Sequence, residues 1–112
     1  MKFIRKIAKW FSKQYHFYSS PKFKSELVKD LPERIPERKV LIVAEGSQPD
    51  TLAFKCPCGC NSNILLNLLP DAKPRWKYKI TASGNISISP SIWRKIGCKS
   101  HFFVIEGRIR WV

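Results

Sequence analysis

The chain has 112 residues, a formal net charge of +13 and 44% hydrophobic residues. This length is typical of one domain, and the apolar share is sufficient for a compact core. No stretch approaches the roughly 18 consecutive apolar residues that would span a bilayer. Lysines and arginines interrupt the apolar residues near the N-terminus, so we expect no secretory signal and a cytoplasmic location.

Residues 1–21 are predicted to form a basic amphipathic helix, appended to one domain over residues 22–112. The apolar residues recur at helical spacing with basic residues between them: Phe3, Ile4, Ile7, Trp10 and Phe11. This stripe could pack on the domain. Alternatively, the basic face could bind an anionic partner, namely a membrane surface, nucleic acid or an acidic protein. The charge does not choose between these interpretations.

The chain after residue 38 has the patterns of β-strands. Strands are predicted at 39–45, at 51–55 and 63–69 on either side of a cysteine run, at 76–82 and 85–89, and in a hairpin over 100–112. The last hairpin should turn at Glu106 and Gly107. Residues 22–38 lack such a pattern and are predicted to be an irregular lead-in.

One short helix is predicted at residues 89–97. Ser89 is a suitable N-cap, Pro90 suits the first turn, and Gly97 is a typical helix stop. Together with the strands, this predicts a mainly β (α+β) fold, namely a small antiparallel β domain with one short helix.

Four cysteines are the most distinctive feature of the sequence. Three lie in the run CPCGC and the fourth follows later: Cys56, Cys58, Cys60 and Cys98. In a reducing compartment, clustered thiols are more typical of a metal site than of disulfides. A closed structural zinc site needs four such ligands. We therefore predict that these four cysteines bind one structural Zn²⁺ ion.

The spacing leaves two alternatives, because the chain lacks the paired C-x-x-C motifs of familiar zinc ribbons. His101 follows Cys98 at C-x-x-H spacing and could replace one cysteine as a ligand. The four residues could also be reduced thiols buried in the core, where free cysteine is common.

His101 is also a candidate general base, since a metal at Cys98 would fix its position. Ser91 and Ser100 are the candidate nucleophiles. Ser91 is favoured because backbone N–H groups at a helix start can hold an oxyanion, whereas Ser100 precedes His101 in a strand and should point to the opposite face. Ser91 could instead simply complete a helix cap.

No carboxylate stands out as a third catalytic group that would orient the histidine. Glu106, Glu45 and Asp71 are the possibilities.

Several of these motifs together resemble a known family. They are FKCPCGC, LLNL, the tryptophan of WKY, ISPSI, GCKSHFF and GRIRW, and they cover roughly residues 38–112. In this combination the chain resembles the BubE family, small metal-binding serine peptidases encoded beside bacterial ubiquitin-like conjugation genes. The chain departs from that pattern at Asn61, where the family has glycine.

The resemblance implies a zinc-stabilised serine peptidase that processes or deconjugates a ubiquitin-like protein from the same operon. It also implies Ser91 and His101 as the catalytic pair and the four cysteines as zinc ligands. The alternative function is a non-catalytic zinc module. Such a module would bind nucleic acid through its charge and exposed aromatics, or act as an adaptor for the ubiquitin-like protein.

Overall fold

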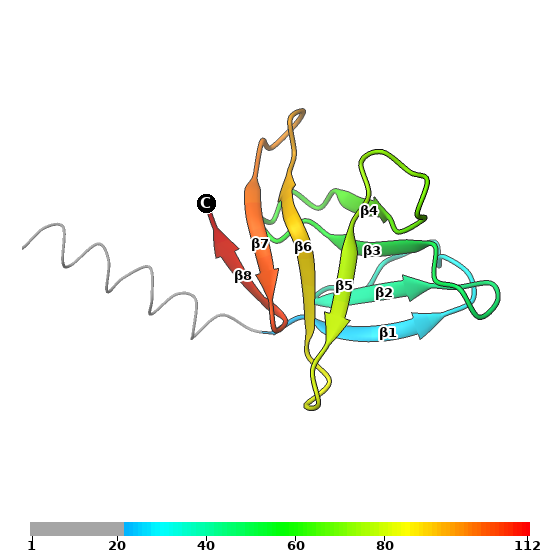
Figure 1. The fold of residues 1–112 in the computed structure, drawn as a ribbon. Coiled ribbons are helices and arrows are strands. Elements are labelled where there is room, and N and C mark those ends of the chain that lie inside the picture. Colours follow the sequence, from blue (N-terminus) through cyan, green and yellow to red (C-terminus); the bar gives the residue numbers. More distant parts are fainter. Residues whose placement is uncertain (1–21) are drawn as a thin grey trace, which may run out of the picture.

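Two four-stranded β-sheets pack face to face in the computed structural model, which describes residues 22–112 (Figure 1). The first sheet has the order β1 (Lys24–Val28), β2 (Lys39–Val43), β3 (Thr51–Lys55) and β4 (Asn63–Asn67). The second has the order β5 (Lys77–Ile80), β6 (Ile86–Trp93), β7 (His101–Ile105) and β8 (Arg108–Trp111). No helix occurs in the described residues, and therefore none there could cross a membrane.

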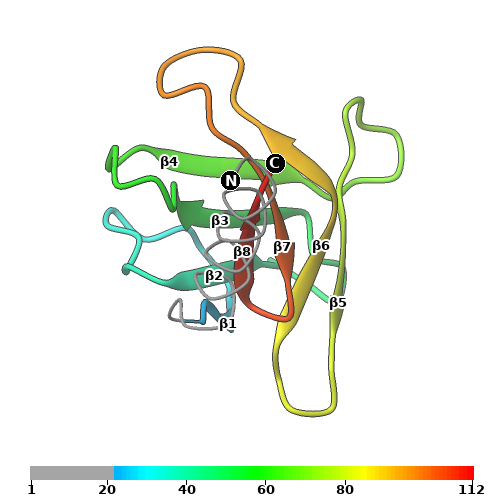
Figure 2. The same ribbon diagram turned by 90° about the vertical axis from the view of Figure 1, so that its left-hand side faces the viewer.

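The hydrophobic core lies between the two sheets, whose strands run across one another (Figure 2). Alternate side chains of β3 and β6 point inward, as the two-residue period of a strand requires. Phe54 and Phe102 are fully buried, with their ring centroids 6.4 Å apart in an edge-to-face arrangement. Burial of such a side chain stabilises the fold by about 1.5–3 kcal/mol. This contact joins the sheets at the centre of the molecule.

Strand β1 shows that the prediction of an irregular lead-in was wrong for residues 24–28. The segment KSELV is largely exposed, so it has no apolar alternation to identify it. It becomes a strand by pairing in parallel with β2 at the edge of the sheet. The connection between them covers the outer face of that sheet, where Ile35 packs against Leu41 and Ala53. Tertiary pairing therefore supplies what the local pattern lacks.

The predicted helix at 89–97 is also wrong, because β6 continues through Trp93. Ile88 and Ile92 both point into the core, and this burial outweighs the local capping signals of Ser89 and Pro90. The pairing with β7 shifts its register between Ile88 and Ile92, so the serine and proline lie in a bulge-like irregularity. Gly97 has a φ of +83° and shapes a loop rather than ending a helix.

The remaining strands confirm the predicted β pattern, and so does the last hairpin. Glu106 and Gly107 form its turn, both with positive φ. Gly107 is also required by a close approach, since a Cβ there would lie 2.6 Å from the carbonyl oxygen of Phe23. The turn thereby holds the start of the described chain against the second sheet. The predicted N-terminal helix lies outside the described residues.

Candidate active site and metal centre

Strands β6 and β7 bring Ser91 and His101 together. Ile92 and Phe102 are opposite one another and point into the core, so their neighbours Ser91 and His101 lie on the outer face of the same sheet. There Ser91 Oγ and His101 Nε2 are hydrogen-bonded at 2.9 Å. Both side chains are half-buried. This is the geometry in which an imidazole can take a proton from a serine hydroxyl.

Two tryptophans hold this pair in place. Trp93 lies opposite His101 in the strand register, and its indole stacks on the imidazole with ring centroids 5.3 Å apart and an interplanar angle of 17°. Trp76 lies just before β5 and donates its indole N–H to the carbonyl oxygen of Ser91 at 3.4 Å. The histidine ring and the serine backbone are therefore each fixed by an aromatic side chain.

The three carboxylates considered from sequence do not join the pair. Glu106 lies in the β7–β8 turn, Glu45 follows β2, and Asp71 follows β4. Among residues 22–112, no acidic side chain forms a hydrogen bond or ion pair with His101. Within that range, stacking on Trp93 takes the place of a carboxylate in orienting the ring.

The four cysteines form one cluster beside this pair, which we call the cysteine cluster. Three lie in the turn between β3 and β4, and Cys98 comes from the loop between β6 and β7. Their sulfur atoms all lie within 4.8 Å of one another, with Cys56 Sγ 3.4 Å from Cys58 Sγ and 3.7 Å from Cys98 Sγ. Asn61, which follows this turn, has a φ of +65°, which asparagine tolerates better than most residues.

These distances fit a metal ion. In a tetrahedral site with Zn–S bonds of about 2.3 Å, the sulfur atoms lie about 3.8 Å apart. The all-thiolate donor set suits Zn²⁺ or another thiophilic metal. His101 is not part of the cluster, since its Nε2 faces Ser91. Four cysteines are thus available as ligands without the histidine.

The thiols of the cluster differ in acidity. Burial raises the pKa of Cys56 to about 12 in the metal-free protein. Hydrogen bonds with the side chain and backbone of Ser62 lower the pKa of Cys60 to about 6. The side chain and backbone of Ser100 likewise lower the pKa of Cys98. Ser100 therefore faces the cysteine cluster, whereas Ser91 faces His101.

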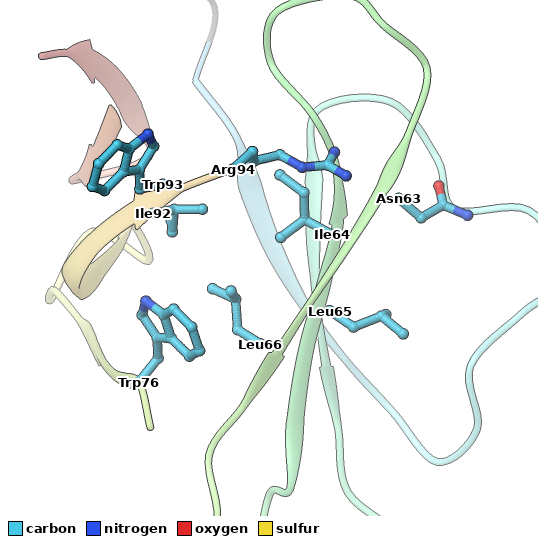
Figure 3. A pocket seen from close by; sticks show the side chains of 8 residues that line it. All are labelled: Asn63, Ile64, Leu65, Leu66, Trp76, Ile92, Trp93 and Arg94. Carbon is cyan, nitrogen blue, oxygen red and sulfur yellow. The ribbon is translucent and has the colours of Figure 1, made fainter. Parts of the chain in front are cut away.

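A hollow of about 230 Å³ adjoins the pair, between the end of β6 and the edge strand β4 (Figure 3). Its walls come from both sheets and from the segment before β5: Asn63, Ile64, Leu65, Leu66, Trp76, Ile92, Trp93 and Arg94. Sequence reasoning missed this hollow and its residues, because Trp93 and Arg94 fell within the predicted helix. Only the pairing of β6 with β7 places them here.

The sequence was compared with protein-family models, curated proteins and solved structures. The family model described as "Bacterial ubiquitination-like system serine protease (BubE)" matches residues 27–112, which extends the resemblance back to the end of β1. The searches of curated proteins and solved structures gave no match. Since the family model covers most of the sequence, this chain belongs to the BubE family of bacterial ubiquitination-like system serine proteases.

Proposed function

We propose that this chain is a serine peptidase that processes or deconjugates a ubiquitin-like protein, with Ser91 as nucleophile and His101 as general base. The observation that carries the proposal is the 2.9 Å contact between Ser91 Oγ and His101 Nε2. The family match supports the reaction class and the ubiquitin-like system. The third support is the position of the pair on a half-buried surface beside a hollow that could receive a peptide.

The reaction would proceed through an acyl-enzyme. Ser91 Oγ attacks the carbonyl carbon at the end of the ubiquitin-like tail while its proton passes to His101 Nε2. The leaving amine takes that proton as the C–N bond breaks. Water then attacks the ester, giving its proton to His101, and Ser91 recovers a proton as the tail leaves with a carboxylate. Trp93 keeps the imidazole aligned throughout.

We further propose that the cysteine cluster binds one structural Zn²⁺ ion. All four ligands would be protein thiolates, so no coordination position is left for water, and the metal would supply stability rather than chemistry. Its effect on the active site would be indirect. Cys98 lies three residues before His101, and the amide N–H of Arg94 donates to the Ser100 carbonyl oxygen at 2.8 Å, which closes the same loop.

The test is cleavage of the ubiquitin-like precursor or conjugate from the same operon, together with labelling by a fluorophosphonate. The wild type should cleave, and the label should map to Ser91 by mass spectrometry. Ser91→Ala and His101→Ala should both be inactive, whereas Ser100→Ala should cleave if its metal content is normal. Cleavage by Ser91→Ala would contradict the proposal. Binding without cleavage by the wild type would instead favour an adaptor.

A further inference from the structure

The side chain of Arg94 has an unusual position in the hollow. It extends from the end of β6 toward Ile64 on β4 (Figure 3). Its Nη1 is buried and has no hydrogen-bond partner among the described residues. A buried guanidinium N–H without an acceptor is costly, by an amount comparable to a lost charged hydrogen bond. An oxygen atom of a bound ligand would satisfy it.

The backbone around the hollow also has groups with which no described strand pairs. The carbonyl oxygen of His101 accepts a hydrogen bond from the amide of Val112, on the β8 side, so His101 does not bond to the main chain of Trp93 opposite it. The N–H and C=O of Trp93 therefore face away from β7, toward the hollow. β5 pairs with β6 only as far as Ser89, so no described strand covers this edge.

The facing wall is a strand edge as well. β4 pairs only with β3 within the described residues. The carbonyl oxygen of Asn67 points outward, since it accepts the Trp76 amide, and the alternation of a strand then turns the main chain of Leu65 outward too. Two strand edges, one at Trp93 and one at Leu65, therefore border the hollow without a pairing strand in residues 22–112. An extended peptide can pair with such an edge through its main chain.

The hollow is continuous with the Ser91–His101 pair through two shared residues. Trp93 lines the hollow and stacks on His101, while Trp76 lines it and hydrogen-bonds to Ser91. A volume of about 230 Å³ is below the roughly 300–1,000 Å³ of pockets for drug-sized ligands. It therefore suits a short stretch of chain next to the cleaved bond rather than a folded domain.

We propose that this hollow binds the extended tail of the substrate, and that Arg94 determines specificity by donating a hydrogen bond to a tail oxygen. The inference rests on the proposed function and identifies where its substrate binds. The group that Arg94 would bind is an oxygen acceptor, which the tail could supply as a main-chain carbonyl or as an acidic side chain. A guanidinium group can donate to either acceptor, with a stronger bond to the carboxylate.

Ser91 and Arg94 are three residues apart, about 10 Å along a strand. The acceptor therefore lies a few residues from the cleaved bond.

The first test is the kinetics of Arg94→Ala and Arg94→Lys on a fluorogenic peptide that carries the tail of the ubiquitin-like protein. Arg94→Ala should lose about 10- to 100-fold in kcat/KM, mainly through KM, because it removes binding rather than chemistry. Arg94→Lys should recover part of the loss. The control is Arg34→Ala, which removes the same charge from an exposed loop and should match the wild type. Equal losses in Arg94→Ala and Arg34→Ala would overturn the inference.

A second readout separates binding from folding and from the proposed function itself. The fluorophosphonate reacts at the serine without occupying the tail site, so Arg94→Ala should be labelled at the wild-type rate and melt cooperatively. If the wild type neither cleaves nor is labelled, the proposed function fails. If the wild type cleaves but Arg94→Ala loses labelling and cleavage in parallel, Arg94 is structural and this inference alone fails.

Two sets of substrate variants identify the oxygen atom that accepts the hydrogen bond from Arg94. In one, each acidic tail residue is changed to its amide; in the other, single tail carbonyls are replaced by methylene. One of these changes should lower kcat/KM in the wild type and have little further effect in Arg94→Ala, as a double-mutant cycle shows for directly coupled groups. If neither set of substrate variants shows coupling to Arg94, the assignment of Arg94 to a tail oxygen is overturned.

Discussion

The cysteine cluster and the Ser91–His101 pair are connected by the loop between β6 and β7, which contains Cys98, but are built by different means. Three of the four cysteines lie in a single turn, so their proximity is largely local. Ser91 and His101 meet only because β6 and β7 pair with a register shift between Ile88 and Ile92. A metal would hold the first region, whereas strand pairing and aromatic stacking hold the second. The two regions should therefore respond differently to substitution.

The largest expected effect comes from Ser91→Ala. Removal of a nucleophile that acts with its base typically lowers kcat by about 10⁴-fold or more. The metal content and the melting temperature should not change, because Ser91 is half-buried on the outer face of its sheet and no core contact is lost. Single-turnover cleavage and thermal melting measure the two quantities. A large loss of melting temperature would show that the two regions are not independent.

The opposite pattern is expected for the cysteine cluster. Cys98→Ser should lose the bound zinc and lower the free energy of unfolding by about 3 kcal/mol, as expected when a metal at about 100-fold its dissociation constant is lost. For a domain of this size, the melting temperature should fall by about 10–20 °C. Elemental analysis and melting curves before and after chelation measure this. Metal-free protein of unchanged stability would contradict the zinc proposal.

Gly107→Ala tests stability without touching either region. The new Cβ would lie 2.6 Å from the Phe23 carbonyl oxygen, at a φ of +78° that alanine rarely adopts. We expect a loss of about 1–3 kcal/mol in stability. Below the melting transition, kcat and zinc content should match the wild type. Denaturant unfolding gives the stability change, and a neutral result would show that the turn can shift away from Phe23.

Trp93→Ala should weaken the pair without unfolding the domain. The indole is 58% exposed, so its removal creates no core cavity, but the imidazole of His101 loses its stacking partner. An aromatic pair contributes about 0.5–1.5 kcal/mol, which corresponds to a fall of about 2- to 10-fold in kcat. Trp93→Phe, which keeps an aromatic face, should recover most of it. Equal kcat values for all three proteins would show that stacking does not orient His101.

The smallest effect concerns the order in which the thiols react. In the metal-free protein, Cys60 has a pKa of about 6 and Cys56 a pKa of about 12. The thiolate is the reactive form, so Cys60 is mostly reactive above pH 6, and Cys56 stays protonated until strongly alkaline pH. Iodoacetamide at pH 7 should therefore modify Cys60 before Cys56, and zinc should protect both. Peptide mapping with time measures the order, and the reverse order would contradict these pKa shifts.

Local sequence patterns predicted the structure correctly where a residue's neighbours in sequence are also its neighbours in space. The alternation in the β6–β7 core residues, the Glu106–Gly107 turn and the CPCGC run all belong to this class. They predicted most strands, the last hairpin and the clustering of three cysteines. The segment at 89–97 shows the limit: Ser89, Pro90 and Gly97 carry helix signals, but burial of Ile88 and Ile92 favours a strand.

The sequence by itself determined a small β domain, and it named the candidate residues for metal binding and for the nucleophile and base. Tertiary structure decided the rest. It made an edge strand of residues 24–28, paired β6 with β7 so that Ser91 contacts His101, and placed Arg94 at the hollow. These outcomes depend on strand register, which is set by pairing between distant segments and by which side chains the core can bury. Neither can be read from a window of neighbouring residues.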